Sequence, residues 1–428
     1  MNEKNKSAGV IHTQSRRKNP PDRVVWEGEI ERLAWGGLGI SRLEDGRILL
    51  LSAPMALFPH EVVRANIYQK SRHAEGDVIS WIKPSPLRAA PECPVAGICG
   101  GCDMQGAGAH YSDLKLSMVE DLFRRMLPNQ PWEWLPAPVG SSNSALRHRI
   151  QLHWDGKSLG FHQRKKHTIV RVASCPAAAP NISQSIPRFE EALASRILPS
   201  RPQRWELATG APPIDVFAID EKQRAWLLAP DGWQKTEKAV VHNFLGHSLT
   251  HKPGGFFQAL AVWAMESFNN VLTQWNVCGN TLYDLYGGAG LFSVILGDRF
   301  KNRVLVESNG DSILCATQNL TNAGLRHQCI QADVAAWMPD NLGETGDVIL
   351  LDPPRAGLDA QVVQKLLGSK ASALMLIGCD GAAFCRDIKR LSQVWKIKKI
   401  AVIDMFPMTA HVECVGMLLQ DASQVESL

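Results

Sequence analysis

Long apolar stretches are absent from this chain of 428 residues. No apolar run reaches the roughly eighteen residues of a membrane-spanning helix, and no charged-then-apolar leader opens the sequence. We therefore expect neither a membrane partner nor secretion, and we place the protein in the cytoplasm. An excess of one charge is also lacking, because the formal net charge is +4. That balance permits a nucleic-acid partner without requiring one.

The spacing of a zinc ribbon is also lacking. Cys93, Cys99 and Cys102 form a C-x5-C-x2-C pattern, and Cys175, before a proline, completes a set of four. Four thiolates suit zinc or a 4Fe–4S cluster. Zinc ribbons usually pair two C-x2-C motifs, and one occurs here, so the spacing argues against zinc. Unrelated buried thiols are the plainer alternative.

The length predicts two or three domains. Residues 1–22 are polar, mildly basic and end in two prolines, which is typical of a flexible tail. Residues 24–84 carry short strand patterns separated by turns, which predicts a small β-barrel of the OB kind, a scaffold often used for oligonucleotides. The expected strands are 24–30, 47–53, 61–70 and 77–83.

Residues 85–240 form the expected central α+β domain, which carries the four cysteines. Apolar residues recur at helical spacing over 110–127, and strand patterns follow at 148–154 and 166–173. Positive charge gathers here in two groups, which either hold RNA phosphates or form a solvated face. These groups are Arg147, His148, Arg149 and Arg164, Lys165, Lys166, His167.

From residue 241 to the end, strand and helix patterns alternate, which predicts a parallel, doubly wound sheet of the Rossmann-like kind. The connection between the last two strands is too short for a parallel crossover, so we expect these two strands to pair antiparallel. The expected strands are 280–286, 303–307, 328–333, 347–352, 373–379, 399–406 and 412–420.

A glycine-rich turn and three acids predict a nucleoside-cofactor pocket at the carboxyl edge of this sheet. The turn DLYGGAG (284–290) follows one strand, and Glu307 ends the next, at the distance where an acid binds two ribose hydroxyls. Asp333 ends the third strand, where it either contacts adenine or caps a helix. The glycines lack G-x-G-x-x-G spacing, and Asp352 can orient a cationic ligand, so S-adenosylmethionine is favoured over a dinucleotide.

The segment MLIGCDGAAFCRD places a thiol, Cys379, where an apolar strand ends and a helix begins. Such a turn lowers the pKa of a thiol and favours a nucleophile, whereas burial in packing is the plainer explanation. Cys385 falls within the following helix, where we expect it to pack. Cys414 follows Glu413 on the last strand, so we expect it on the opposite face.

Together these motifs resemble the class I RNA uracil-C5 methyltransferases, in particular the ribosomal members with an N-terminal TRAM domain and an iron–sulfur cluster. The resemblance spans nearly the whole chain and rests on CPVAGICGGC, FFQ (256–258), DLYGGAG, LLDPPRAG, the cysteine turn and FPMTAHVE (406–413). It implies that Cys379 is the nucleophile and Glu413 the base. It implies a 4Fe–4S cluster on the four cysteines. It also implies S-adenosylmethionine binding by Gln258, Tyr286, Glu307 and Asp352.

The resemblance implies methylation of uridine at carbon 5 in RNA, in 23S rRNA rather than transfer RNA, and we expect a monomer. A thiolate that adds to carbon 6 makes carbon 5 nucleophilic, and a base then removes the proton from carbon 5. Amine methylation needs neither group, and DPPR lacks the aromatic residue usual in such enzymes.

The chain departs from the family pattern in three places. Leu260 and Leu291 stand where asparagine is common, and Asp380-Gly381 replaces the usual Asn-Pro after the cysteine. The last departure keeps a second hypothesis open, an RNA-binding iron–sulfur protein without catalysis, and a transfer-RNA target stays the other alternative.

Overall fold

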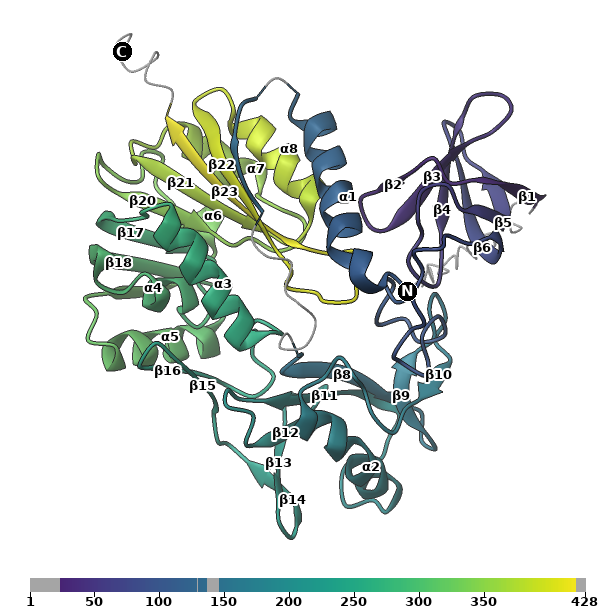
Figure 1. Ribbon diagram of the computed structural model, residues 1–428. Coiled ribbons are helices and arrows are strands. Elements are labelled where there is room, and N and C mark those ends of the chain that lie inside the picture. The colour runs from purple at the N-terminus through teal and green to yellow at the C-terminus, as the bar shows by residue number, and fades with distance from the viewer. Residues whose placement is uncertain (1–23, 129, 137–145, 421–428) are drawn as a thin grey trace, which may run out of the picture.

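The computed structural model describes residues 24–128, 130–136 and 146–420, so the tail expected at residues 1–22 lies outside the described residues. Figure 1 shows three parts: a purple β-structure, a blue-to-teal sheet with α2 beside it, and a green-to-yellow sheet flanked by helices. Among the helices of the described ranges, none is long and apolar enough to cross a bilayer.

The N-terminal part is a six-stranded sheet in the order β1-β5-β6-β4-β3-β2. Leu49, Leu51 and Val63 are fully buried in its core, as the alternating pattern predicts. The four predicted strands are present, and two short strands flank the GGLG turn. The strands are β1 (Val24–Glu29), β2 (Arg32–Ala34), β3 (Leu38–Arg42), β4 (Ile48–Ser52), β5 (Val62–Gln69) and β6 (Ala74–Lys83). Closure into an OB-type barrel stays a prediction.

The central part is a seven-stranded antiparallel sheet in the order β10-β9-β8-β11-β12-β13-β14. Ile150, Leu152 and Trp154 alternate along β8 and are buried in one cluster with residues of α2 (Pro180–Ala194), so one face of the sheet is covered. The strands are β8 (Arg149–Trp154), β9 (Leu159–His162), β10 (Ile169–Arg171), β11 (Gln203–Thr209), β12 (Val216–Asp220), β13 (Ala225–Ala229) and β14 (Gly232–Thr236). A hairpin of β15 (Val240–Phe244) and β16 (His247–His251) follows.

The C-terminal part is an eight-stranded sheet in the order β19-β18-β17-β20-β21-β23-β22-β7. Its strands β17 to β21 are parallel, whereas β23 runs antiparallel to both β21 and β22. The predicted doubly wound sheet with a final antiparallel pair is therefore confirmed. The strands are β17 (Gly279–Leu285), β18 (Phe300–Glu307), β19 (Gln328–Gln331), β20 (Val348–Leu351), β21 (Ala373–Gly378), β22 (Trp395–Ile403) and β23 (Glu413–Gln420).

Helices cover both faces of this sheet, because each face builds its own apolar cluster. One cluster includes residues of α3 (Ala261–Gln274), α4 (Leu291–Ile295) and α5 (Gly310–Asn322). The other includes residues of α7 (Ala360–Leu367) and α8 (Gly381–Leu391) and of the one-turn α6 (Val334–Trp337). Two short 3-10 turns, η1 (Gly108–His110) and η2 (Gly297–Arg299), complete the elements.

One segment placed in the central domain by sequence belongs instead with the C-terminal sheet. The helix α1 (Tyr111–Met126) buries Phe123 against Phe384 of α8, with ring centroids 5.8 Å apart. The strand β7 (Glu133–Pro136) pairs in parallel with β22, and Figure 1 shows the blue helix beside the yellow strands. The helical pattern predicts an apolar face but does not identify which sheet that face covers.

Candidate active site

The carboxyl edge of the C-terminal sheet gathers most of the residues singled out by sequence. Tyr286 follows β17, Glu307 ends β18, Asp352 follows β20 and Cys379 follows β21. β23 runs in the opposite direction, with Cys414 paired to Gly378. The first residue of β23, Glu413, therefore lies at the same edge, and its side chain is 3% exposed.

The glycine turn holds the carboxylate of Glu307 in place. The Gly288 amide donates to Oε2 of Glu307 at 3.2 Å, and the Asn309 amide donates to Oε1 at 2.7 Å. Tyr286 and Gly288 both have positive φ, 63° and 53°, so the backbone turns sharply after β17. The turn thereby brings the backbone of the half-buried Gly288 to the carboxylate of Glu307.

Asp284, which the sequence analysis does not single out, lies at the start of this turn and stabilises it through buried hydrogen bonds. Its fully buried carboxylate accepts from the Ser293 amide at 3.1 Å and the Ser293 hydroxyl at 2.6 Å. Burial raises the pKa of Asp284 to about 7. Its place at the start of DLYGGAG is the signal that could have found it.

Asp333 caps α6, since its Oδ1 accepts from the Ala336 amide at 3.1 Å. This contact is the helix-cap alternative considered from the sequence. Asp333 also lies close to Tyr286: the pKa of that phenol is raised to about 12, first by burial and then by the charge of Asp333. An exposed cap beside the glycine turn keeps one carboxylate oxygen free for a ligand.

Asp352 and Glu413 are two acids whose pKa values are both raised. Burial and then the charge of Asp284 raise the pKa of Asp352 to about 7. Burial and then the charge of Asp352 raise the pKa of Glu413 well above its usual range, while Arg355 acts in the opposite direction. A cation bound between these acids would favour the ionised form of both.

Cys379 is half-buried and lines a narrow cavity with Pro353, Pro354, Arg355 and Asp380. The expectation of a lowered thiol pKa is wrong for the free protein. Burial raises the pKa of Cys379, and the charge of Glu413 raises it further, whereas the hydrogen-bonded Arg355 guanidinium lowers it. Desolvation outweighs the favourable end of the helix dipole here.

The residues after the cysteine cap and pack the start of α8. Asp380 is the N-cap, accepting from the Ala383 amide at 2.8 Å. A Cβ at Gly381 would lie 2.9 Å from both the Trp35 ring and Leu122. Glycine therefore stands after Asp380 because an aromatic ring from the N-terminal part occupies the space of a side chain.

The two other thiols near this site, Cys385 and Cys414, are both fully buried. Cys385 and Cys414 each have 0% exposure and belong to the apolar cluster under α7 and α8. Burial raises the pKa of Cys385 to about 12 and that of Cys414 well above its usual range. Packing of Cys385 is thus confirmed, and Cys379 is the accessible thiol of the three.

Gln258 lies in a loop that residues of the central part hold through hydrogen bonds. Nη1 of Arg149 donates to the carbonyls of Gly255 and Phe257 at 3.1 and 3.3 Å, and the His148 amide donates to Ala259 at 2.7 Å. The Phe257 ring stacks on His242 with centroids 4.4 Å apart. Gln258 itself is half-buried.

The four cysteines of the central part line one cavity. Cys93, Cys99, Cys102 and Cys175 surround it with Arg147, whose Nη2 lies 3.9 Å from Sγ of Cys102. Burial raises the thiol pKa of Cys99, Cys102 and Cys175. Over the described ranges, no three His, Cys, Asp or Glu side chains are close enough to hold a metal ion.

Several basic residues of the central part make internal contacts. Arg149 pairs with Glu206 at 2.6 Å, and Lys165 pairs with Asp77 of β6 in the N-terminal part. Arg147 donates to the carbonyls of Gly101 and Pro407, each at 3.3 Å. Arg147 and Lys165 therefore join parts of the molecule, as does Arg149 through the carbonyls of Gly255 and Phe257, and phosphate binding by these residues stays a prediction.

This chain is similar to known proteins in sequence and in structure. The family model described as tRNA (Uracil-5-)-methyltransferase matches residues 344–422. An uncharacterized RNA methyltransferase from Streptomyces avermitilis is 30% identical, over 92% of this chain and 98% of the relative. The 23S rRNA (uracil(1939)-C(5))-methyltransferase RlmD of Chromohalobacter salexigens is 28% identical, over 93% of this chain and 90% of the relative.

One solved structure shares the fold over nearly the full length. It is the Pyrococcus abyssi tRNA (uracil-54, C5)-methyltransferase in complex with S-adenosyl-L-homocysteine. The TM-score is 0.71 at 21% identity, covering 92% of this chain and 99% of that chain. The likeness extends across all three parts described above.

Proposed function

The chain belongs to the family of RNA uracil-C5 methyltransferases, and from this we propose that it methylates carbon 5 of a uridine in 23S rRNA. The names of several relatives support the ribosomal target. Transfer RNA is the second candidate target, favoured by the fold shared with the archaeal enzyme. We further propose that the enzyme acts as a monomer in the cytoplasm.

The observation that carries this proposal is the approach of Cys379 to Glu413 across neighbouring antiparallel strands. A thiol and a carboxylate at one point are what methylation of carbon 5 requires and what amine methylation does not. The sulfur of Cys379 adds to carbon 6 of the uracil, which makes carbon 5 a nucleophile. After carbon 5 has taken the methyl group of S-adenosylmethionine, with S-adenosylhomocysteine as the leaving group, Glu413 removes the proton from carbon 5, and the carbon–sulfur bond breaks to release the thiolate.

Protonation states set the order of these steps. In the free protein the raised pKa of Cys379 keeps it a thiol, and the raised pKa of Glu413 favours its neutral form, while Asp352, with a pKa of about 7, is partly ionised at neutral pH. S-adenosylmethionine supplies an electrophilic methyl group on a positively charged sulfur. Asp352 and Glu413 are expected to ionise beside this charge, so the base is prepared when the methyl donor is bound.

We propose that five residues hold the methyl donor. Glu307 is positioned by the glycine turn to accept from two ribose hydroxyls. Asp352 would hold the cationic sulfur, and Gln258 follows Phe257, whose ring stacks on His242. The full set is Gln258, Tyr286, Glu307, Asp333 and Asp352.

We propose that Cys93, Cys99, Cys102 and Cys175 hold a 4Fe–4S cluster. Their convergence on one cavity, lined by apolar side chains and Arg147, suits a thiolate-bound group with net negative charge. Thiols with raised pKa values ionise when they bind metal, so incorporation should release protons.

Methyl transfer to defined RNAs tests the proposal. The protein is incubated with labelled S-adenosylmethionine and either 23S rRNA or transfer RNA, and the nucleosides are identified by mass spectrometry. We expect 5-methyluridine in 23S rRNA, its loss in Cys379→Ala, and its retention in the matched control Cys385→Ala. Binding of RNA without any 5-methyluridine would instead support the hypothesis of a non-catalytic iron–sulfur protein.

A further inference from the structure

The loop at residues 404–412, between β22 and β23, ends at the proposed base, Glu413. Several backbone N–H and C=O groups of this loop form hydrogen bonds with residues outside the β22–β23 hairpin. The residues that make these hydrogen bonds show which part of the molecule positions Glu413.

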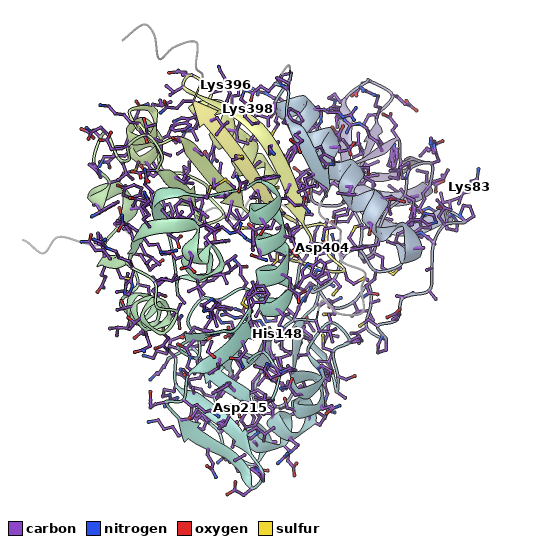
Figure 2. The ribbon with its side chains drawn as sticks, turned by 60° about the vertical axis from the view of Figure 1, so that its left-hand side comes forward. Lys83, His148, Asp215, Lys396, Lys398 and Asp404 are labelled. Carbon is purple, nitrogen blue, oxygen red and sulfur yellow. The ribbon has the colours of Figure 1, made fainter. Side chains whose placement is uncertain are left out.

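The first half of the loop is fixed by α1 and α3. Lys115, which is fully buried, donates to Oδ1 of Asp404 at 2.5 Å and to the Phe406 carbonyl at 3.1 Å. The Tyr111 hydroxyl donates to Oδ2 of Asp404 at 2.8 Å, and the Trp263 indole donates to its carbonyl at 3.0 Å. Figure 2 shows Asp404 well inside the molecule, whereas Lys398 lies at the outer end of the yellow strands.

The second half of the loop is fixed by the segment that contains Cys102. The Met104 amide donates to the Met408 carbonyl at 2.9 Å, and Oδ1 of Asp103 accepts from the Ala410 amide at 2.9 Å. Arg147 bridges the same two segments, because its Nη2 reaches the carbonyls of Gly101 and Pro407 and Sγ of Cys102. Asp103 and Met104 thus bond the loop just before Glu413 directly, and Gly101 and Cys102 are linked to it through Arg147.

The nucleophile is positioned by a different set of contacts. Cys379 precedes the N-cap Asp380, and the start of α8 packs on Trp35 and Leu122. Loss of a contact at Asp103 should therefore move Glu413 while it leaves Cys379 in place. Helix α1 supports both regions, through Lys115 and Leu122, whereas Asp103 bonds the loop before Glu413.

We infer that Asp103 and Arg147 are positioning residues for Glu413, so that the cysteine segment controls the removal of the proton from carbon 5. This inference rests on the proposed function. In the controlled step the carboxylate of Glu413 takes the proton, and the C5–H electron pair forms the C5–C6 double bond. The C6–S bond breaks, and its electrons leave with Cys379 as thiolate. Addition of sulfur and transfer of methyl come earlier and are not controlled by this contact.

The test compares Asp103→Ala with Asp103→Asn, which keeps the oxygen that accepts from Ala410. Asp113→Ala, at an exposed position of α1, is the matched control. On uridine RNA, Asp103→Ala should release product roughly tenfold to a hundredfold more slowly, since small misplacements of a catalytic group cost that much. It should accumulate a methylated covalent complex that survives denaturation. Asp103→Asn and Asp113→Ala should match the wild type.

The rate of adduct formation with 5-fluorouridine RNA separates the outcomes, because that adduct needs no proton removal. An unchanged rate in Asp103→Ala supports the inference. Equal slowing of adduct formation and release, or no slowing of release, overturns it. Loss of bound iron and sulfide from Asp103→Ala alone also overturns it, since the carboxylate would then serve the cysteines. Failure of the wild type to form any adduct would refute the proposed function instead.

Discussion

Replacement of Gly381 by alanine should destabilise the turn after Cys379, although alanine is usually favoured over glycine in helices. The φ of Gly381 is not positive, so alanine can adopt this backbone, which by itself stabilises by about 0.4–1 kcal/mol. The new Cβ would lie 2.9 Å from the Trp35 ring and from Leu122, and overpacking of this kind costs about 1–3 kcal/mol. The net expectation is a loss of between about 0 and 2.6 kcal/mol, centred on about 1 kcal/mol.

The sign should reverse when Trp35 is removed. In a Trp35→Ala background the ring is gone, and Leu122 can move into the space, so Gly381→Ala should stabilise by about 0.4–1 kcal/mol. The free energies come from amide hydrogen exchange of α8 in the four proteins of the cycle. Additive effects, with Gly381→Ala equally costly in both backgrounds, would refute the packing explanation for glycine after Asp380.

Other predictions concern the thiol and the buried ion pair. Because burial raises the pKa of Cys379, its alkylation by iodoacetamide should keep accelerating above pH 9, the ordinary thiol value. At pH 8 Arg355→Ala should slow alkylation, because the residue that lowers the pKa is lost, and an opposite result would contradict the assigned contact. Lys115→Met leaves Asp404 buried without its cation, so the free energy of unfolding in urea should fall by about 3–5 kcal/mol. Lys398→Met, at an exposed position of β22, is the control, and an equal loss there would show that burial of the pair is not the cause.

The sheet and the site edge could be predicted from sequence because their signals are local. The alternation of apolar strand patterns with helices predicts that most strands run parallel, and the short connection before Glu413 predicts that the last two strands pair antiparallel. The partner of α1 could not be predicted, since an amphipathic helix does not specify the surface that it covers. The charges of Arg147, Arg149 and Lys165 were equally ambiguous, because their partners lie far away in the chain.

The pKa of the Cys379 thiol could not be predicted from sequence either. A strand-to-helix turn predicts a favourable dipole at Cys379. Burial and the carboxylate of Glu413 outweigh that dipole, and both depend on how β23 packs beside β21. Gly381 is similar, because the space for a larger residue there is taken by Trp35 and Leu122, which both lie far earlier in the chain.

The most direct test of the account is to locate the covalent bond to the substrate. RNA containing 5-fluorouridine is incubated with the protein and S-adenosylmethionine, denatured and digested, and the modified peptide is sequenced by mass spectrometry. The account predicts that the nucleotide is attached to the peptide at Cys379 and that no attachment occurs in Cys379→Ala. Attachment to another residue, or full methylation of uridine RNA by Cys379→Ala, would contradict it.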